Sequence, residues 1–432
     1  MKAPALDFRS GVALVMGNMI GSGIFLLPAS LAGYGRWGLI GWGCSAAGAM
    51  VLAALFRSLA RIRPSAAGGP YAYVREAFGD FMGFTVGWGY WVSIWCTNAA
   101  IAVAAVGYIG VFLPGLVEDN AVAAFTGLGL IWGFTAINAL GIREVSGVQL
   151  VTTALKVLSL IFVALVGLSH VQWDGLWIEP TTEGSIFGAV TATTTLTLFA
   201  FLGMESAAIT SHEVVDSERN TGRATMLGTG LTAAVYIVCS VVVMGVLPPE
   251  SLAVSSAPFA EAAEVIQGGV SMEFVALAAI IATLGALNGW ILIQGQVPLA
   301  VAKDGLFPKL FARTNRFGAP IMGIAFSSAL ASGVLLLRYS DSLVDTFTFM
   351  MTLSTLSALL PYALSALSLL VLLPRAGGDK GGIGQRLMAV GAVMFCAWVI
   401  FGCGAEVVLY GSILLGLGLL MFVLYRFSAP RP

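Results

Sequence analysis

The sequence predicts an all-α integral membrane protein, as its composition, its apolar windows and the placement of its charges indicate. Apolar side chains make up 58% of the 432 residues, and charged side chains only 10%. A membrane helix needs roughly 20 mostly apolar residues, so the chain has enough for about a dozen spans and little left for a soluble domain. The formal net charge of -1 provides no basic surface, and we expect no nucleic acid partner.

Twelve apolar windows follow one another along the chain, and each is expected to cross the lipid bilayer as a helix. The first window lacks a small-residue cleavage site of the signal-peptide kind, so we expect it to remain as a membrane helix. The windows cover residues 10–33, 38–60, 83–113, 121–140, 147–169, 186–211, 223–247, 272–302, 320–337, 345–373, 387–404 and 407–426.

The basic residues are distributed unevenly over the segments between these windows. All but three of the 21 Lys and Arg residues fall on the side of the N-terminus. Arg36 and Arg338 fall in loops on the opposite side, and Lys156 lies within a span. Because short loops rich in Lys and Arg stay in the cytoplasm, we predict a multi-pass protein of the cell inner (plasma) membrane with both termini cytoplasmic.

Two of the predicted spans are interrupted in the same way. The first contains Gly21-Ser22-Gly23, and the sixth carries Gly203 next to Met204 and Glu205. Spans one and six are equivalent positions in two five-helix halves, and matching interruptions indicate an inverted-repeat transporter with its substrate at the bilayer midplane. We predict a first repeat over residues 1–170, a second over 171–374 and two further spans over 375–432.

The interruption in the first span frees backbone N–H groups at the start of the half-helix near Ile24. The positive end of a helix dipole suits an anion such as a substrate carboxylate, and Ser22 adds a hydroxyl. The alternative is a small-residue face for close helix packing.

Two charged residues lie inside predicted spans. An ionised Glu205 near the membrane core costs roughly 2.5 kcal/mol or more, which a cationic substrate, a bound proton or a basic neighbour must offset. The alternative for this carboxylate is a buried structural hydrogen bond. Lys156 either occupies the place of a bound cation, pairs with a carboxylate, or tethers the carbonyls of the broken first span.

No motif in the sequence predicts catalysis. The chain lacks a phosphate-binding loop, a nucleophile elbow and a zinc-binding helix motif, so we expect it not to be an enzyme. Its five cysteines lie singly in apolar stretches, and His170 and His212 are far apart, so we expect neither a metal nor a cofactor.

Several segments taken together resemble the amino acid, polyamine and organocation transporters, and within them the basic amino acid and polyamine antiporters. The match covers nearly the whole chain. These segments are Met19–Phe25, Ala67–Tyr73, Phe201–Ala207, Glu218–Asn220, Leu287–Trp290, Lys303–Pro308 and Leu409–Ser412. The resemblance implies the leucine-transporter type of fold, alternating access, and exchange of an amino acid for a related amine or amino acid. It also implies a homodimer.

The resemblance further implies roles for particular residues. The substrate carboxylate is expected to bind at Ser22 and Gly23. The protein side chains expected to contact the substrate are the amide of Asn98, the outer aromatic Phe199, the central aromatic Trp290 and the hydroxyl of Ser354. An inner gate with a proton-sensitive carboxylate between two tyrosines falls on Tyr90, Glu205 and Tyr362.

Two departures from the antiporters leave the substrate open. Phe199 stands where the arginine/agmatine exchangers have Trp, and Lys156 is a feature of neutral and proton-coupled members. The alternative function is therefore a proton-coupled symporter or exporter of neutral amino acids. A remote alternative from another class is a non-transporting membrane sensor, although no loop has room for a signalling domain.

Overall fold

The computed structural model of the protein describes residues 7–63, 69–141, 146–177, 180, 184–206, 217–338, 340–375 and 382–428. Within these ranges every regular element is a helix, in agreement with the predicted all-α class. His212, Lys2, Arg143, Lys380 and Arg431 lie outside the described residues. The side of the membrane on which the termini lie therefore stays a prediction.

Nine helices in the described part of the chain are long and apolar enough to cross a membrane. Each coincides with one of the predicted windows, so the chain is a multi-pass membrane protein. These helices are α3 (Arg36–Ile62), α5 (Asp80–Ile109), α6 (Asn120–Ala139), α7 (Ser146–Gly167), α10 (Ser217–Val246), α13 (Ser271–Lys303), α15 (Leu343–Arg375), α16 (Ile383–Gly402) and α17 (Gly404–Ser428).

The other three predicted spans are bent or short. Helices α1 (Phe8–Met19) and α2 (Ser22–Leu31) form an apolar pair bent by 40° at the predicted break. Helix α8 (Ile186–Leu198) with the turn η5 (Phe199–Phe201), and helix α14 (Ile321–Leu337), are apolar but shorter. The total of twelve crossings and the division into two five-helix repeats stay predictions.

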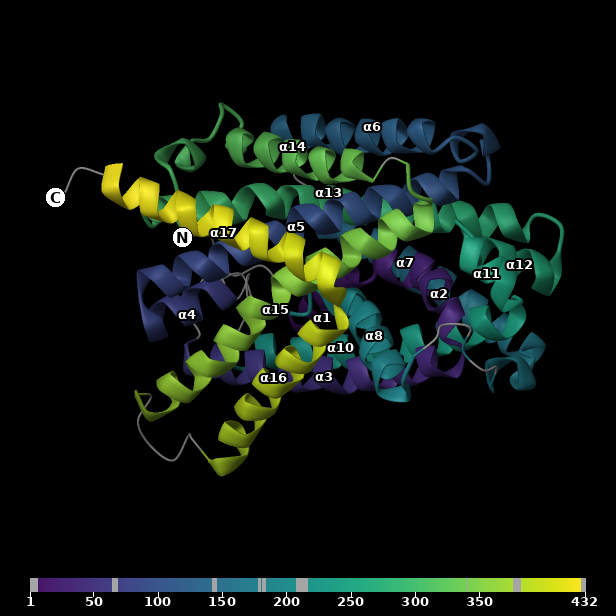
Figure 1. Ribbon diagram of the computed structural model, residues 1–432, viewed down its shortest axis with the longest axis horizontal. Helices are drawn as coiled ribbons and strands as arrows, with labels where there is room; N and C mark the ends of the chain where they lie inside the picture. The colour runs from purple at the N-terminus through teal and green to yellow at the C-terminus, as the bar shows by residue number, and fades with distance from the viewer. Residues whose placement is uncertain are drawn as a thin grey trace.

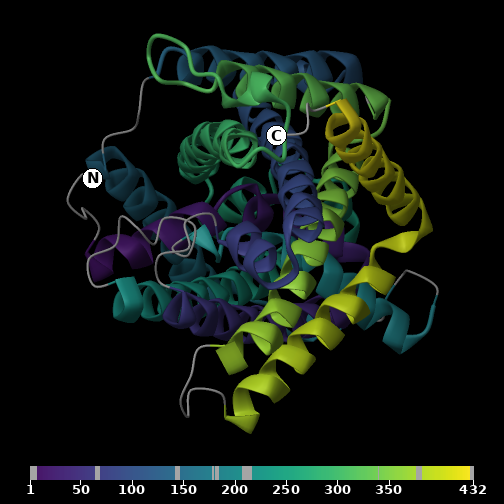
Figure 2. The same ribbon diagram turned by 90° about the vertical axis from the view of Figure 1, so that its left-hand side faces the viewer.

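Two helices form the centre of the bundle, and others line its edges. Helices α5 and α15 pack against each other through the middle, whereas α6 and α14 lie side by side along one edge (Figure 1, Figure 2). Helix α17 lies on the outside in both views. Shorter helices connect the spans: η1 (Ala32–Tyr34), α4 (Pro70–Phe78), η2 (Pro114–Leu116), η3 (Leu168–His170), η4 (Trp173–Trp177), α11 (Pro249–Val254), α12 (Pro258–Gln267) and η7 (Lys309–Ala312).

The exposed surface of the outer helices is apolar. Phe401 in α16 is 82% exposed and Leu165 in α7 is 68% exposed, while α5 is almost wholly buried. In water such apolar faces would favour association with other surfaces. In a bilayer they meet hydrocarbon, while the helices satisfy their own backbone groups.

The two interrupted spans contact each other at their breaks. A Cβ atom on Gly23 in α2 would lie 3.0 Å from the Cα of Ala200 in η5, so glycine allows the backbones to approach closely. After η5 the chain becomes extended at Leu202 and adopts a φ of +99° at Gly203, a conformation that favours glycine. The breaks of spans one and six therefore form one junction inside the bundle.

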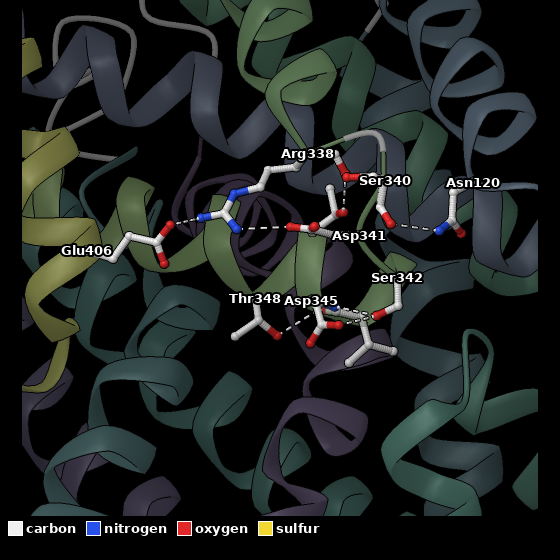
Figure 3. Close-up of polar contacts among 10 residues, drawn as sticks. Asn120, Arg338, Ser340, Asp341, Ser342, Asp345, Thr348 and Glu406 are labelled. Atoms are coloured by element: carbon white, nitrogen blue, oxygen red, sulfur yellow. Dashed lines mark hydrogen bonds and ion pairs between the residues drawn. The ribbon is translucent and has the colours of Figure 1, made fainter.

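An arginine joins three helices near their predicted outer ends (Figure 3). Arg338 ends α14 and pairs with Asp341 at 2.9 Å and with Glu406 in the first turn of α17. Its guanidinium carbon lies 3.9 Å from the ring centroid of Phe349 in α15. Two carboxylates and one aromatic face thus hold a cation that is largely shielded from solvent.

We expect Arg338→Met to lower the melting temperature of the purified protein by about 1–2 °C, because ion pairs and a cation–π contact at a partly exposed site contribute about 1–2 kcal/mol. Thermal unfolding monitored by tryptophan fluorescence measures this. Arg313→Met, at an exposed arginine, is the matched control. Equal melting temperatures for the two variants would contradict a joining role.

Candidate functional site

A buried carboxylate lies between two tyrosines at the centre of the bundle. Tyr90 in α5 donates to Glu205 Oε1 at 2.6 Å, and Tyr362 in α15 donates to Oε2 at 2.7 Å. The Glu205 side chain is fully buried just after the break in span six. The structure thus brings together the three residues that the resemblance assigns to an inner gate, and each carboxylate oxygen receives one phenolic hydrogen bond.

We call Tyr90, Glu205 and Tyr362 the carboxylate clasp. The protonation state of Glu205 changes which hydrogen bonds the two tyrosines can make with it. An ionised carboxylate accepts at both oxygens, whereas a protonated one carries an O–H that donates. Protonation would therefore force one of the two tyrosine hydroxyls to turn away or to accept instead. Because the tyrosines belong to α5 and α15, such a change acts directly on the contact of these two helices with the break in span six.

The start of α2 offers polar groups at the other break. As the first residues of the helix, Ser22 and Gly23 have backbone N–H groups without an acceptor in their own helix, and the preceding Gly21 provides no side-chain cap. The Ser22 hydroxyl is buried and has no hydrogen-bond partner among the described residues. These donors are suited to a carboxylate.

The two predicted aromatic contacts, Phe199 and Trp290, are both buried and have different neighbours. Phe199 lies next to the α2 break, with its ring edge 3.4 Å from the position of a Cβ on Gly23, and packs edge-on against Phe347. Trp290 in α13 belongs to the same buried apolar cluster as Tyr90, which donates to the Glu205 carboxylate. Both side chains are 5% exposed.

The predicted amide and hydroxyl differ in what they contact. Asn98 in α5 donates to Gln294 at 2.6 Å, and its own Oδ1 has no partner among the described residues. Ser354 in α15 is already engaged, because it donates to the carbonyl of Ser93 at 2.9 Å and lies 2.7 Å from the Thr97 hydroxyl. The serine therefore ties α15 to α5, and Asn98 has the free acceptor.

Lys156 in α7 is buried between two other spans. Its Nζ donates to the carbonyl of Gly17 in α1 at 3.4 Å, and its Cε lies 3.8 Å from the position of a Cβ on Gly285 in α13. The contact with Gly17 agrees with the tether that was one of the sequence-based alternatives. A role as substitute for a bound cation stays a prediction.

Sequence reasoning missed two polar groups, of which the first bonds to Asn98. Gln294 is fully buried in α13, four residues after Trp290 and so on the same helix face. An uncharged amide in a span and in register with a candidate aromatic was the signal that could have revealed it. The other group joins α4 to the end of α13, where Asp304 accepts from Tyr71 at 2.8 Å and pairs with Arg75 at 2.8 Å.

The Tyr71 hydroxyl remains a donor over a wide pH range. Burial of the phenol, and then the hydrogen bond to Asp304, raise the pKa of Tyr71 above its ordinary value. The bond between α4 and the end of α13 therefore persists at physiological pH.

A multi-pass bundle with two helices broken side by side, and with buried polar groups at the breaks, is the architecture of a membrane transporter for small molecules. The chain belongs to the amino acid permease family, whose model matches residues 6–424. This confirms the resemblance drawn from the sequence.

Three relatives match over nearly their full lengths. The putative arginine/ornithine antiporter of Bacillus subtilis (strain 168) is 34% identical over 97% of this chain and 96% of its own length. The putrescine transporter PotE of Escherichia coli (strain K12) is 33% identical, with 97% and 94% covered. The cadaverine/lysine antiporter of the same strain is 32% identical, with 95% and 92% covered.

A solved structure shares the fold. The manganese transporter of Eremococcus coleocola, crystallised with an aromatic bis-isothiourea compound, superposes with a TM-score of 0.64 over 97% of this chain and 93% of its own. At 13% sequence identity the likeness concerns the fold alone.

Proposed function

We propose that the protein is an antiporter that exchanges an amino acid for a related amine or amino acid by alternating access. The observation that carries the proposal is the Tyr90–Glu205–Tyr362 clasp together with the start of α2, where the buried Ser22 hydroxyl has no hydrogen-bond partner among the described residues. Relatives named for arginine/ornithine, putrescine and cadaverine/lysine transport support this substrate class.

In this proposal the two breaks bind the carboxylate and the α-amino group of the amino acid substrate. The N–H groups at Ser22 and Gly23 receive the carboxylate, where the helix dipole favours negative charge. Phe199 covers the substrate from outside, and Trp290 separates it from the clasp. Glu205 keeps the cytoplasmic side of the binding site closed through its hydrogen bonds to α5 and α15. That side opens when these hydrogen bonds are rearranged.

The proposal also covers the location, the oligomeric state and the proton dependence of the protein. We place it in the cell inner membrane with both termini in the cytoplasm, on the strength of its uneven distribution of basic residues. A homodimer and a proton acting on Glu205 belong to the proposal as well.

Ligand binding to the purified protein tests the substrate class, because a ligand that binds the folded state raises its melting temperature. We expect arginine, ornithine, lysine or the amines formed by their decarboxylation to raise the melting temperature in a concentration-dependent way. Glucose should have no effect. Failure of every amino acid and amine to stabilise the protein would contradict the proposal.

The second candidate function, proton-coupled transport of neutral amino acids, is favoured by the buried position of Lys156 between α1 and α13. We expect Lys156→Met to slow substrate-driven turnover in proteoliposomes at least tenfold, because the mutation removes the cation that contacts the broken span.

Lys309→Met, at an exposed lysine in η7, is the matched control. Unchanged turnover in the Lys156 variant would reduce this residue to a structural tether. Alanine uptake driven by a proton gradient alone would instead favour the second function.

A further inference from the structure

A continuous chain of hydrogen bonds runs through the interior from α6 to α5. Thr135 in α6 donates to the carbonyl of Ile131 at 2.7 Å, and its hydroxyl lies 2.6 Å from that of Ser328 in α14. Gln294 in α13 donates through Nε2 to Ser328 at 2.8 Å and accepts through Oε1 from Asn98 Nδ2 at 2.6 Å. Four spans thus share one buried polar path.

The hydrogen bond from Thr135 to a backbone carbonyl sets the donors along this path. Thr135 donates its single hydroxyl proton to the carbonyl of Ile131, which can only accept. Thr135 must then accept from Ser328, and Ser328 must accept from Gln294. The amide oxygen of Gln294 therefore faces Asn98, which must present its NH₂ group.

A second contact holds the Gln294 amide in the same orientation. Its Nε2 lies 3.2 Å from the carbonyl of Ile324, which can only accept. Rotation of the amide by 180° would bring an oxygen against this carbonyl and against the committed hydroxyl of Ser328.

One acceptor is left over at the other end of the path. Asn98 Oδ1 is fully buried and has no hydrogen-bond partner in the part of the chain that the structure describes. Asn98 lies two turns after Tyr90 on α5, and Gln294 lies one turn after Trp290 on α13, while Tyr90 and Trp290 belong to one buried apolar cluster. The unpaired oxygen therefore belongs to the wall that carries the aromatic side chains of the candidate site.

We propose that Gln294 is a positioning residue that keeps the carbonyl oxygen of Asn98 available to the substrate, and that this oxygen selects substrates whose side chain ends in an ammonium or guanidinium donor. The inference rests on the proposed exchange function and narrows its substrate class to cationic amino acids and diamines. A neutral aliphatic side chain offers no donor and leaves a buried acceptor unpaired, which discriminates strongly against it.

The test is competition in proteoliposomes between ornithine and norvaline, which has the same carbon chain without the terminal amine. We expect wild-type protein to prefer ornithine at least tenfold. Gln294→Met removes the hydrogen bond that orients the Asn98 amide and lets this amide rotate. The preference for ornithine over norvaline should then fall about tenfold while exchange persists. Gln296→Met, a change of the same kind two residues along α13, should keep the wild-type preference.

An unchanged preference in Gln294→Met, or an equal loss of apparent affinity for both compounds, would overturn the inference. Wild-type protein that does not distinguish the two compounds would overturn it as well. If Gln294→Met fails to fold, Gln294→Leu removes the same amide with another apolar side chain and should also lower the preference; an unchanged preference there has the same meaning. Failure of wild-type protein to exchange any amino acid or amine would instead contradict the proposed function.

Discussion

Replacement of Glu205 by alanine is expected to abolish the pH dependence of exchange and to slow it at least tenfold. The variant loses both hydrogen bonds, from Tyr90 at 2.6 Å and from Tyr362 at 2.7 Å. Hydrogen bonds to a charged group contribute about 1.5–3 kcal/mol each, and both α5 and α15 lose one such bond to the break in span six. Exchange rates in proteoliposomes, measured from acidic to neutral pH, provide the comparison.

The matched control is Glu273→Ala, at an exposed acid in the first turn of α13. It should keep both the wild-type rate and the wild-type pH profile. A Glu205→Ala variant that also keeps both would show that the carboxylate has only a structural role.

A valine in place of Gly23 is expected to reduce exchange more than a hundredfold. Even a single Cβ atom there would lie 3.0 Å from both Cα and Cβ of Ala200, and 3.4 Å from the ring of Phe199. The substitution separates the two broken spans and fills the space next to the free N–H groups of α2, so it acts on the site as well as on packing. Exchange is measured per amount of protein recovered in the membrane.

The control for this change is Gly43→Val in α3, where a Cβ would meet nothing within 4 Å. It should transport at nearly the wild-type rate. Normal exchange by Gly23→Val would contradict the assignment of the α2 break to the substrate.

Much of the fold could be predicted because hydrophobicity along the chain reports directly on membrane spans. Helices occupy all twelve predicted windows at least in part, and the two interruptions fall at Gly21-Ser22-Gly23 and at Gly203. The sequence could not reveal how the breaks meet, because the close approach of Gly23 to Ala200 depends on tertiary packing. Span number and the repeat remain predictions, since α8 with η5 and α14 are shorter than the usual crossing.

The site was accessible to sequence reasoning only where charge or a resemblance marked it. Glu205 stands out because a carboxylate inside a span is costly, and the resemblance supplied its two tyrosines. Ser354 looked like a substrate contact but is engaged by Ser93 and Thr97. Gln294 escaped notice because an uncharged amide inside a span stands out only through its register with Trp290 on the same helix.

The most direct test of the account is efflux of preloaded labelled ornithine from proteoliposomes, with and without putrescine, lysine or alanine outside. An antiporter must return to its starting state with a substrate bound, so we predict efflux only when an external amine or amino acid is present, with and without a proton ionophore. Efflux at the same rate into substrate-free buffer would contradict exchange as the function of this protein.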